Sequence, residues 1–220
     1  MQHPHRAPTT LDLTELPEGS ELRSVTAVPT EVSGRRALRV ELTDAVTLHG
    51  TPGVDYVDMP TFMIIPEGFE NGTIEVDILS RLNGKGPADA RAFAGIAYRI
   101  PDGGDRFEAV YLRPLNGWKT NPPSPRDQRA VQYFAYPDWK FDRLREESPD
   151  GRYEAGADIG PDEWITLRID IDGTRLTVAV NEAEALTLSE TKAAPAAGSI
   201  GLFVDIGSES FFSNLKLTPN

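Results

Sequence analysis

The sequence predicts an all-β protein, a two-sheet antiparallel jelly-roll sandwich. In many short stretches, apolar and polar residues alternate with the period of two that is typical of half-buried strands. Turn residues separate these stretches, which recur at intervals of about 8 to 15 residues. No stretch carries a stripe of apolar residues at helical spacing. Residues 182–192 contain helix-forming residues but lack such a stripe.

Alternation and turn chemistry justify the individual strands. Asn71-Gly72 and Asp172-Gly173 are hairpin-turn signals, and residues 49–60 read as a turn-rich loop. No repeat or linker divides the chain, so we expect a single domain over residues 1–220, with residues 1–10 as a loose N-terminus. Outside the central stretch, the expected strands are 22–28, 37–42, 61–65, 74–78, 164–170, 176–180, 199–206 and 211–217.

Composition excludes several classes of function. The 22 basic and 34 acidic side chains give a net charge of −12, which argues against nucleic acid or an anionic membrane as partner. The same balance disfavours a strongly anionic polysaccharide, although a local arginine cluster could override it. Cysteine is absent, which excludes disulfides, thiolate metal sites and a cysteine nucleophile. The oligomeric state stays open.

The ends of the chain and its histidines add little chemistry. The first residues lack the basic-then-apolar pattern of a secretory signal, and no apolar run reaches membrane-spanning length. We therefore expect a soluble, cytoplasmic protein, while the mature chain of a secreted protein would look the same. Of the three histidines, His3 and His5 lie in the N-terminus. His49 follows a strand and precedes a turn, so Ser-His-Asp catalysis is not expected.

The stretch 93–141 concentrates aromatic and arginine side chains in three strand-like runs, 93–99, 107–113 and 131–136. Alternation places Phe93, Gly95, Ala97 and Arg99 on one face of the first run. In the second run it places Phe107, Ala109, Tyr111 and Arg113 opposite Glu108, Val110 and Leu112. In the third run it places Gln132, Phe134 and Tyr136 opposite Val131, Tyr133 and Ala135.

Aromatic rings, guanidinium groups and an amide together suit a sugar, because pyranose C–H faces stack on rings while fixed polar groups match hydroxyls. Small residues such as Gly95 would leave room for the ligand. The expected saccharide-binding residues are Arg99, Arg113, Gln132, Tyr133 and Tyr136, with Trp118 (in the long loop 115–129) and Trp139 closing the ends of the groove. The structural alternative is that the rings form core and the arginines pair with Glu108, Asp105 or Asp138.

If the surface is catalytic, Glu108 or Asp138 is the expected general acid or base, and Tyr111 or Tyr133 a proton shuttle. Glu75 and Asp77 resemble a paired-acid motif but lack its third acid. No cofactor or catalytic metal is expected. Structural calcium at Asp170/Asp172 or Asp102/Asp105 is the open alternative. Tyr153-Glu154-Ala155-Gly156 echoes an alginate-lyase motif whose partner histidine motif is missing.

Several segments together resemble the concanavalin A-like lectin/glucanase superfamily, and within it the LamG-like and 3-keto-disaccharide hydrolase domains. They are the stretches 72–76, 95–99, 111–114, 163–164, 198–202 and 212–216, and the resemblance covers roughly residues 65–218. It implies a jelly roll with a glycan site on its concave face. Arg99 matches the arginine that ends a family strand, and Gln132 falls near a later glutamine.

Two positions depart from the pattern of the hydrolase-like domains. Ala92-Phe93-Ala94-Gly95 replaces an Asn-Ser-Gly sequence, and Ala130 replaces a glutamate two residues before the glutamine. Three functions therefore stay open: a glycoside hydrolase-like or lyase enzyme that holds a saccharide, a non-catalytic glycan-binding module, and a LamG-like interaction domain.

Overall fold

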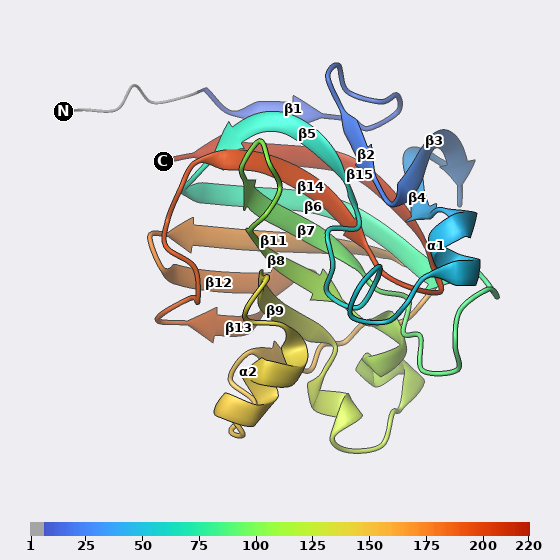
Figure 1. The fold of residues 1–220 in the computed structure, drawn as a ribbon, viewed down its shortest axis with the longest axis vertical. Coiled ribbons are helices and arrows are strands. Elements are labelled where there is room, and N and C mark those ends of the chain that lie inside the picture. The colour runs from blue at the N-terminus through green and yellow to red at the C-terminus, as the bar shows by residue number, and fades with distance from the viewer. Residues whose placement is uncertain (1–6) are drawn as a thin grey trace.

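The computed structural model describes residues 7–220, which form two antiparallel β-sheets packed face to face (Figure 1). The expected jelly-roll sandwich is confirmed. The strands are β1 (Thr9–Leu11), β2 (Glu21–Arg23), β3 (Val25–Val32), β4 (Arg35–Leu42), β5 (Phe62–Phe69), β6 (Gly72–Leu82), β7 (Ala94–Ile100), β8 (Phe107–Leu112), β9 (Val131–Tyr136), β10 (Glu154–Ala155), β11 (Trp164–Asp172), β12 (Arg175–Val180), β13 (Ala183–Leu188), β14 (Gly198–Val204) and β15 (Ser208–Pro219). The helices are α1 (Asp44–His49) and α2 (Phe141–Glu147), with 3-10 turns η1 (Pro114–Asn116), η2 (Trp118–Thr120) and η3 (Arg126–Gln128).

Strand order explains which segments meet. The eight-stranded sheet runs β13-β12-β11-β6-β15-β4-β3, with β1 also paired to β15. The seven-stranded sheet runs β10-β9-β8-β7-β14-β5-β2, so the three runs of the central stretch are neighbours in it. The final strands β14 and β15 separate into different sheets, which is how the C-terminal segment ties the sandwich together.

The core between the sheets follows the alternation seen in the sequence. Ile74, Val76 and Ile78 on β6 pair in register with Ile169, Leu167 and Ile165 on β11, and all six are fully buried. On the seven-stranded sheet the corresponding inward positions include Ile96 and Val110, which face each other across β7 and β8. Burial of such side chains is the main stabilising term of the fold.

The outer face of the seven-stranded sheet is also apolar, and most of it is covered. Phe107 packs edge-on against Phe62 and Phe134, with ring centroids 5.0 and 5.6 Å apart, and Phe134 contacts Phe203 at 5.6 Å. All four rings are buried. The segment 50–61 crosses in front of one end of this sheet, and α2 lies beside its strand β9 (Figure 1). The open concave surface that we expected is therefore reduced to a pocket at one end.

Some local predictions differ from the structure. Thr9 and Thr10 already pair with β15, so regular structure begins inside the segment expected to be loose; residues 1–6 lie outside the described range. Residues 183–188 form β13, because Leu186 and Leu188 bury against the sheet and this packing overrides the helix preference of the segment. The short helices α1 and α2 carry too few apolar residues to give a periodic signal.

A buried ion pair lies at one end of the interior, between the sheets. Arg99 Nη1 is 2.7 Å from Glu108 Oε2, and the Tyr133 hydroxyl donates to Glu108 Oε1 at 2.7 Å. Arg99 also donates to the backbone carbonyls of Glu70 and Gly173, which belong to turns at that end of the sandwich. The side chains of both charged residues are at most 3% exposed.

The side chain of Arg99 turns inward because the backbone is irregular there. Its φ is +58°, and the pairing of β7 with β14 shifts register at this point. A bulge of this kind reverses the face to which the next side chain points. Arg99 therefore does not share the face of Tyr111, as strict alternation predicted, and reaches Glu108 instead.

We predict that Glu108→Ala lowers the free energy of unfolding by about 3–5 kcal/mol, because it leaves Arg99 buried without its partner. The double variant Arg99→Met/Glu108→Leu should recover most of that loss. Urea denaturation at pH 7 measures both, and Glu75→Ala, which breaks the exposed Lys216–Glu75 pair, serves as the control with a change within about 1 kcal/mol. A Glu108→Ala variant as stable as the wild type would contradict this structural role.

Candidate functional site

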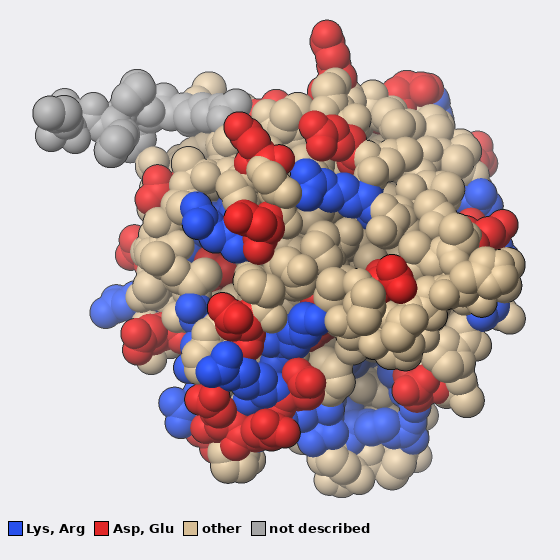
Figure 2. Space-filling model, viewed as in Figure 1, with Lys and Arg blue, Asp and Glu red and all other residues tan. Residues whose placement is uncertain are grey.

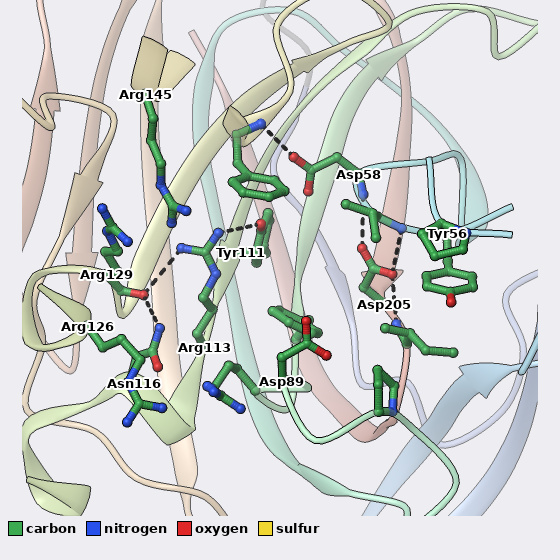
Figure 3. Close-up of a pocket in the computed structure, with 17 residues that line it drawn as sticks. Tyr56, Asp58, Asp89, Tyr111, Arg113, Asn116, Arg126, Arg129, Arg145 and Asp205 are labelled. Carbon is green, nitrogen blue, oxygen red and sulfur yellow. Dashed lines mark hydrogen bonds between the residues drawn. The ribbon is translucent and has the colours of Figure 1, made fainter. Parts of the chain in front are cut away.

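A pocket of about 490 Å³ opens at one end of the covered face, where β8 ends and the segment 113–130 begins (Figure 3). Its volume is that of a small-ligand site. Arginines lie on one side of it and the carboxyls Asp58 and Asp205 on the other, with Tyr111 between them. The lining residues are Pro52, Tyr56, Val57, Asp58, Pro87, Asp89, Arg91, Phe93, Tyr111, Arg113, Asn116, Arg126, Arg129, Phe141, Arg145, Asp205 and Ile206.

The carboxylate of Asp205, just after β14, holds the loop that carries Asp58. It accepts backbone N–H bonds from Val57 and Asp58, each at 3.0 Å, and from Ile206 at 2.7 Å. Val57 and Asp58 have φ of +72° and +53°, the left-handed region that a β-branched residue rarely adopts. Two successive N–H groups in this conformation form a concave anion site, which Asp205 fills. Backbone strain of this kind concentrates at functional sites.

Asp58 is buried in the pocket wall, where one of its carboxyl oxygens accepts the Phe141 N–H at 2.8 Å. Burial and the neighbouring carboxylate of Asp205 raise the pKa of Asp58 to about 7, while the Phe141 N–H, Arg113 and Tyr111 act in the opposite direction. Burial also raises the pKa of Asp205, although three backbone N–H donors and Arg113 act in the opposite direction. Asp58 is thus a carboxyl that changes charge near neutral pH.

Tyr111 and Arg113 connect the two sides of the pocket. Arg113 Nη2 donates to the Tyr111 hydroxyl at 2.8 Å and to Gln132 Oε1 at 3.1 Å. Burial raises the pKa of Tyr111 well above its usual value, with Asp58 adding to the rise and Arg113 opposing it. The phenol therefore stays protonated and can donate a hydrogen bond toward Asp58 or a ligand.

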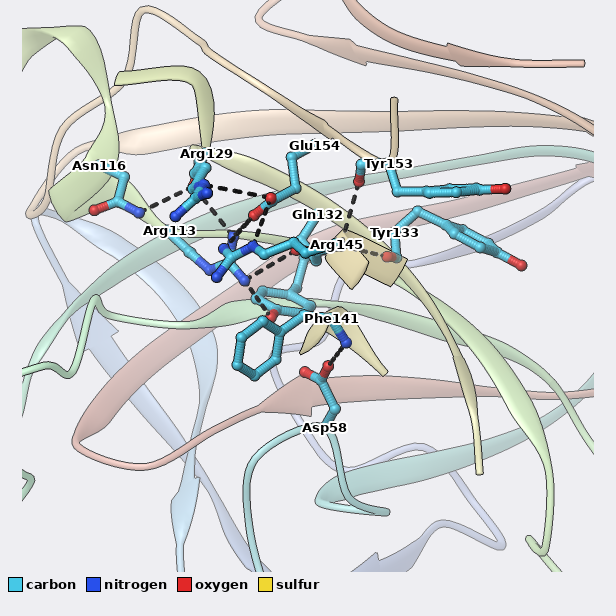
Figure 4. Close-up of polar contacts among 11 residues, drawn as sticks. Asp58, Arg113, Asn116, Arg129, Gln132, Tyr133, Phe141, Arg145, Tyr153 and Glu154 are labelled. Atoms are coloured by element: carbon cyan, nitrogen blue, oxygen red, sulfur yellow. Dashed lines mark hydrogen bonds and ion pairs between the residues drawn. The ribbon is translucent and has the colours of Figure 1, made fainter. Parts of the chain in front are cut away.

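Three arginines surround the carboxylate of Glu154 on β10 (Figure 4). Arg113 Nη1 lies 2.7 Å from Oε1, Arg145 Nε lies 2.8 Å from Oε2, and Arg129 Nε lies 3.5 Å from Oε2. Burial opposes ionisation of Glu154, but Arg145 and Arg113 outweigh it and lower the pKa of the carboxyl. Glu154 therefore stays ionised and holds the side chains of Arg113, Arg129 and Arg145 in place.

Of the residues predicted to bind or act on a saccharide, Tyr111 and Arg113 line the pocket. Gln132 is buried behind Arg113 and contacts it without lining the pocket. Gly95 does not make room for a ligand; a side chain there would collide with the backbone of β8, since its Cβ would lie 2.1 Å from Val110 O.

The other predicted residues lie elsewhere. Glu108, Arg99 and Tyr133 form the buried cluster between the sheets. Tyr136 stacks on Phe107, and Trp139 lies beneath Arg143 and Lys192. Trp118 is half exposed and donates to the Asp127 carbonyl, while Asp138 is on the surface. None of these seven side chains is part of the pocket lining.

The alternation of apolar and polar residues could not predict four of the pocket residues, because they lie in loops and a short helix that are far apart in the chain. These residues are Asp58, Asp205, Arg129 and Arg145. The one sequence signal was the turn-rich loop 49–60, where Asp58 follows apolar residues and precedes Met59-Pro60. Turn acids usually serve the turn itself, so this signal is weak.

Two further observations concern ions and membranes. Within residues 7–220, no group of three or more His, Asp or Glu side chains is placed to hold a metal ion. At the calcium alternative, the Asp170 carboxylate is bound by Arg168 and Thr73. The same residues contain no helix that is both long and apolar enough to cross a membrane.

Solved structures with a similar fold confirm the architecture. A protein of unknown function with a galectin-like fold from Bacillus subtilis has a TM-score of 0.57 at 11% identity, with 99% of this chain and 98% of that chain covered. The carbohydrate-binding module CBM66 from the same organism gives 0.55 at 12% identity, covering 89% and 96%. A putative glycosyl hydrolase from Parabacteroides distasonis gives 0.53 at 14% identity, covering 96% and 100%.

Comparison with curated proteins gave no match. A family model, that of the 3-keto-alpha-glucoside-1,2-lyase-like domain, matches residues 55–218, a range that includes Asp58 and the rest of the pocket except Pro52. Because this match spans more than half of the sequence, the chain belongs to the 3-keto-alpha-glucoside-1,2-lyase-like domain family.

Proposed function

We propose that the pocket binds a saccharide and that Asp58, with Tyr111, supplies the acid-base chemistry that cleaves its glycosidic bond. The observation that carries the proposal is the buried Asp58 carboxyl, whose pKa of about 7 suits a general base at neutral pH. Membership of a lyase-like family and the carbohydrate-related structural neighbours support the same class of ligand.

The family description names the reaction that such a base could perform. In a 3-keto glucoside the C2 hydrogen lies next to the ketone and is therefore acidic. Ionised Asp58 takes this proton, the C2–H electron pair forms an enolate, and the enolate expels the oxygen on C1 as a C1–C2 double bond forms. The Asp58 carboxyl, now protonated, gives this proton to the expelled oxygen, which leaves as an alcohol, so that bonds and charges balance.

Tyr111 and Arg113 suit the developing negative charge of this sequence. The Tyr111 hydroxyl stays protonated and already accepts a bond from Arg113, which makes it a charge-assisted donor toward an enolate oxygen. Phe93, which meets Tyr111 edge-on at 6.0 Å, adds an apolar surface for a sugar ring.

A second candidate is a glycan-binding module without catalysis. It is favoured by the bond between Asp58 and the Phe141 N–H, which gives the carboxyl a role in holding α2 against the loop 50–61. In that case the pocket would bind a sugar and leave it intact.

We expect the titration of Asp58 to appear in stability. Its pKa is about 7 in the folded chain against 3.8 in the unfolded chain, so its contribution to stability is complete below pH 3.8 and is lost as the pH rises through about 7. Between pH 5 and 8 this loss amounts to about 2–3 kcal/mol. Asp58→Asn should remove that part of the pH dependence, measured by urea denaturation at both pH values.

The exposed Asp142→Asn on α2 is the matched control and should keep the wild-type dependence. A wild-type and an Asp58→Asn protein that lose the same stability between pH 5 and 8 would mean that Asp58 is ionised throughout this range.

The catalytic proposal is tested with a nitrophenyl 3-keto-α-glucoside and the parent α-glucoside. We expect release of nitrophenol from the keto sugar alone, with kcat/KM rising as the pH passes through about 7 and Asp58 becomes the free base. Asp58→Asn should lower kcat by about 10²–10⁴-fold and change KM only slightly. Asp142→Asn is again the control.

Two results would count against this mechanism. Binding of the keto sugar without turnover would favour the glycan-binding module. Full activity of Asp58→Asn would remove Asp58 as the base, whatever the wild type does.

A further inference from the structure

The arginine side of the pocket holds more positive charge than its carboxylates neutralise. Arg113, Arg129 and Arg145 surround a single carboxylate, that of Glu154. One carboxylate balances one guanidinium group, so this cluster keeps a surplus of positive charge. Figure 2 shows Lys and Arg side chains gathered near the lower edge of the face, where the segment 113–130 lies in Figure 1.

Two more arginines of the pocket add to this surplus. Arg126 and Arg91 form no ion pair with any carboxylate of residues 7–220, and Arg91 donates only to the Ala88 and Ala90 carbonyls. Burial and the charge of Arg126 lower the pKa of Arg91, and burial and Arg145 lower that of Arg129. Asp89 opposes this effect at Arg91, and Glu154 opposes it at Arg129. This side of the pocket thus holds five arginines against two carboxylates, and the surplus of positive charge remains.

A buried acceptor in the same part of the pocket also lacks a partner. Asn116 is 4% exposed and its Nδ2 donates to the Arg129 carbonyl, yet its Oδ1 accepts no hydrogen bond. Buried amide oxygens are normally satisfied. A hydroxyl of a bound ligand would supply the missing donor.

We propose that the saccharide of this pocket carries an anionic group, a carboxylate or a phosphate, which the arginine side binds while a sugar hydroxyl donates to Asn116. Guanidinium groups match both anions through paired hydrogen bonds. The inference rests on the proposed function, because it takes the pocket to be a saccharide site and adds the class of its substrate.

The remainder of the molecule limits how large that anion can be. The chain carries a net charge of −12, so a long polyanion would be repelled outside the pocket. A pocket of about 490 Å³ instead suits a mono- or disaccharide with one acidic group. The anion would lie beside Arg126 and Arg91, because both Nη groups of Arg113 already donate to protein acceptors.

Calorimetric titration of the whole chain tests the inference with four probes: methyl α-glucoside, methyl α-glucuronide, glucose 6-phosphate and inorganic phosphate. We expect the glucuronide or the sugar phosphate to bind at least tenfold more tightly than the glucoside, and this preference to weaken between 50 and 500 mM salt. The glucuronide and phosphate arms distinguish the two anionic groups.

Arg126→Gln and the double variant Arg126→Gln/Arg129→Gln should reduce the preference to threefold or less. Arg126 makes no ion pair, so the single variant tests the inference even if the double variant fails to fold. Arg143→Gln, on the exposed side of α2 and paired with Glu147, is the matched control that keeps the preference.

Each other outcome is decisive. Equal binding of neutral and acidic sugars, or a preference that survives both arginine variants, overturns the inference and leaves the proposed function standing. Phosphate that binds as tightly as the sugar phosphate overturns it too, because the sugar then contributes nothing. If none of these sugars and no 3-keto glucoside binds, the proposed function fails as well.

Discussion

The pocket depends on the hydrogen bonds between the Asp205 carboxylate and the backbone of the loop 50–61. The loop 50–61 crosses an apolar sheet face and has little regular structure of its own. Two N–H bonds to this carboxylate, from Val57 and Asp58, hold these residues in the left-handed backbone conformation. The same contact brings a second carboxyl close to Asp58. Burial is the main reason for the raised pKa of Asp58, and Asp205, which also holds the loop, raises that pKa further.

A second consequence is the separation of charge across the pocket. The carboxyls of Asp58 and Asp205 come from the loop 50–61 and the end of β14, while most of the arginines come from the end of β8, from η3 and from α2 (Figure 3). The segment before β7 contributes both Arg91 and the carboxyl of Asp89. Tyr111 lies on the boundary: its hydroxyl accepts a hydrogen bond from Arg113 on one side, and Asp58 on the other side adds to the rise of its pKa. A ligand that spans this boundary meets donors at one end and a titratable acceptor at the other, which favours a polar molecule with one acidic end.

Alternation in the sequence predicts the sandwich well, since the hairpin at Asp172-Gly173 and the paired faces of β6 and β11 follow directly from it. It also places Tyr111 and Arg113 on one face. It fails at Arg99, where a register shift turns the side chain to the other face, since a bulge leaves no mark in the alternation. Asp58 and Asp205 were unpredictable for another reason: their partnership joins residues 147 positions apart.

The carboxyls of Glu154 and Asp58 differ in pKa, and this difference explains why Asp58 rather than Glu154 suits proton transfer at neutral pH. The resemblance to hydrolase-like domains leads us to expect a glutamate two residues before Gln132, but this chain has Ala130 at that position. Glu154 on β10 pairs with Gln132 on β9, so a carboxylate from a different strand lies close to Gln132. Three arginines hold that carboxylate ionised, and three N–H groups bind that of Asp205. Asp58 accepts one backbone N–H and lies beside another carboxyl, and its pKa of about 7 allows it to exchange a proton at neutral pH.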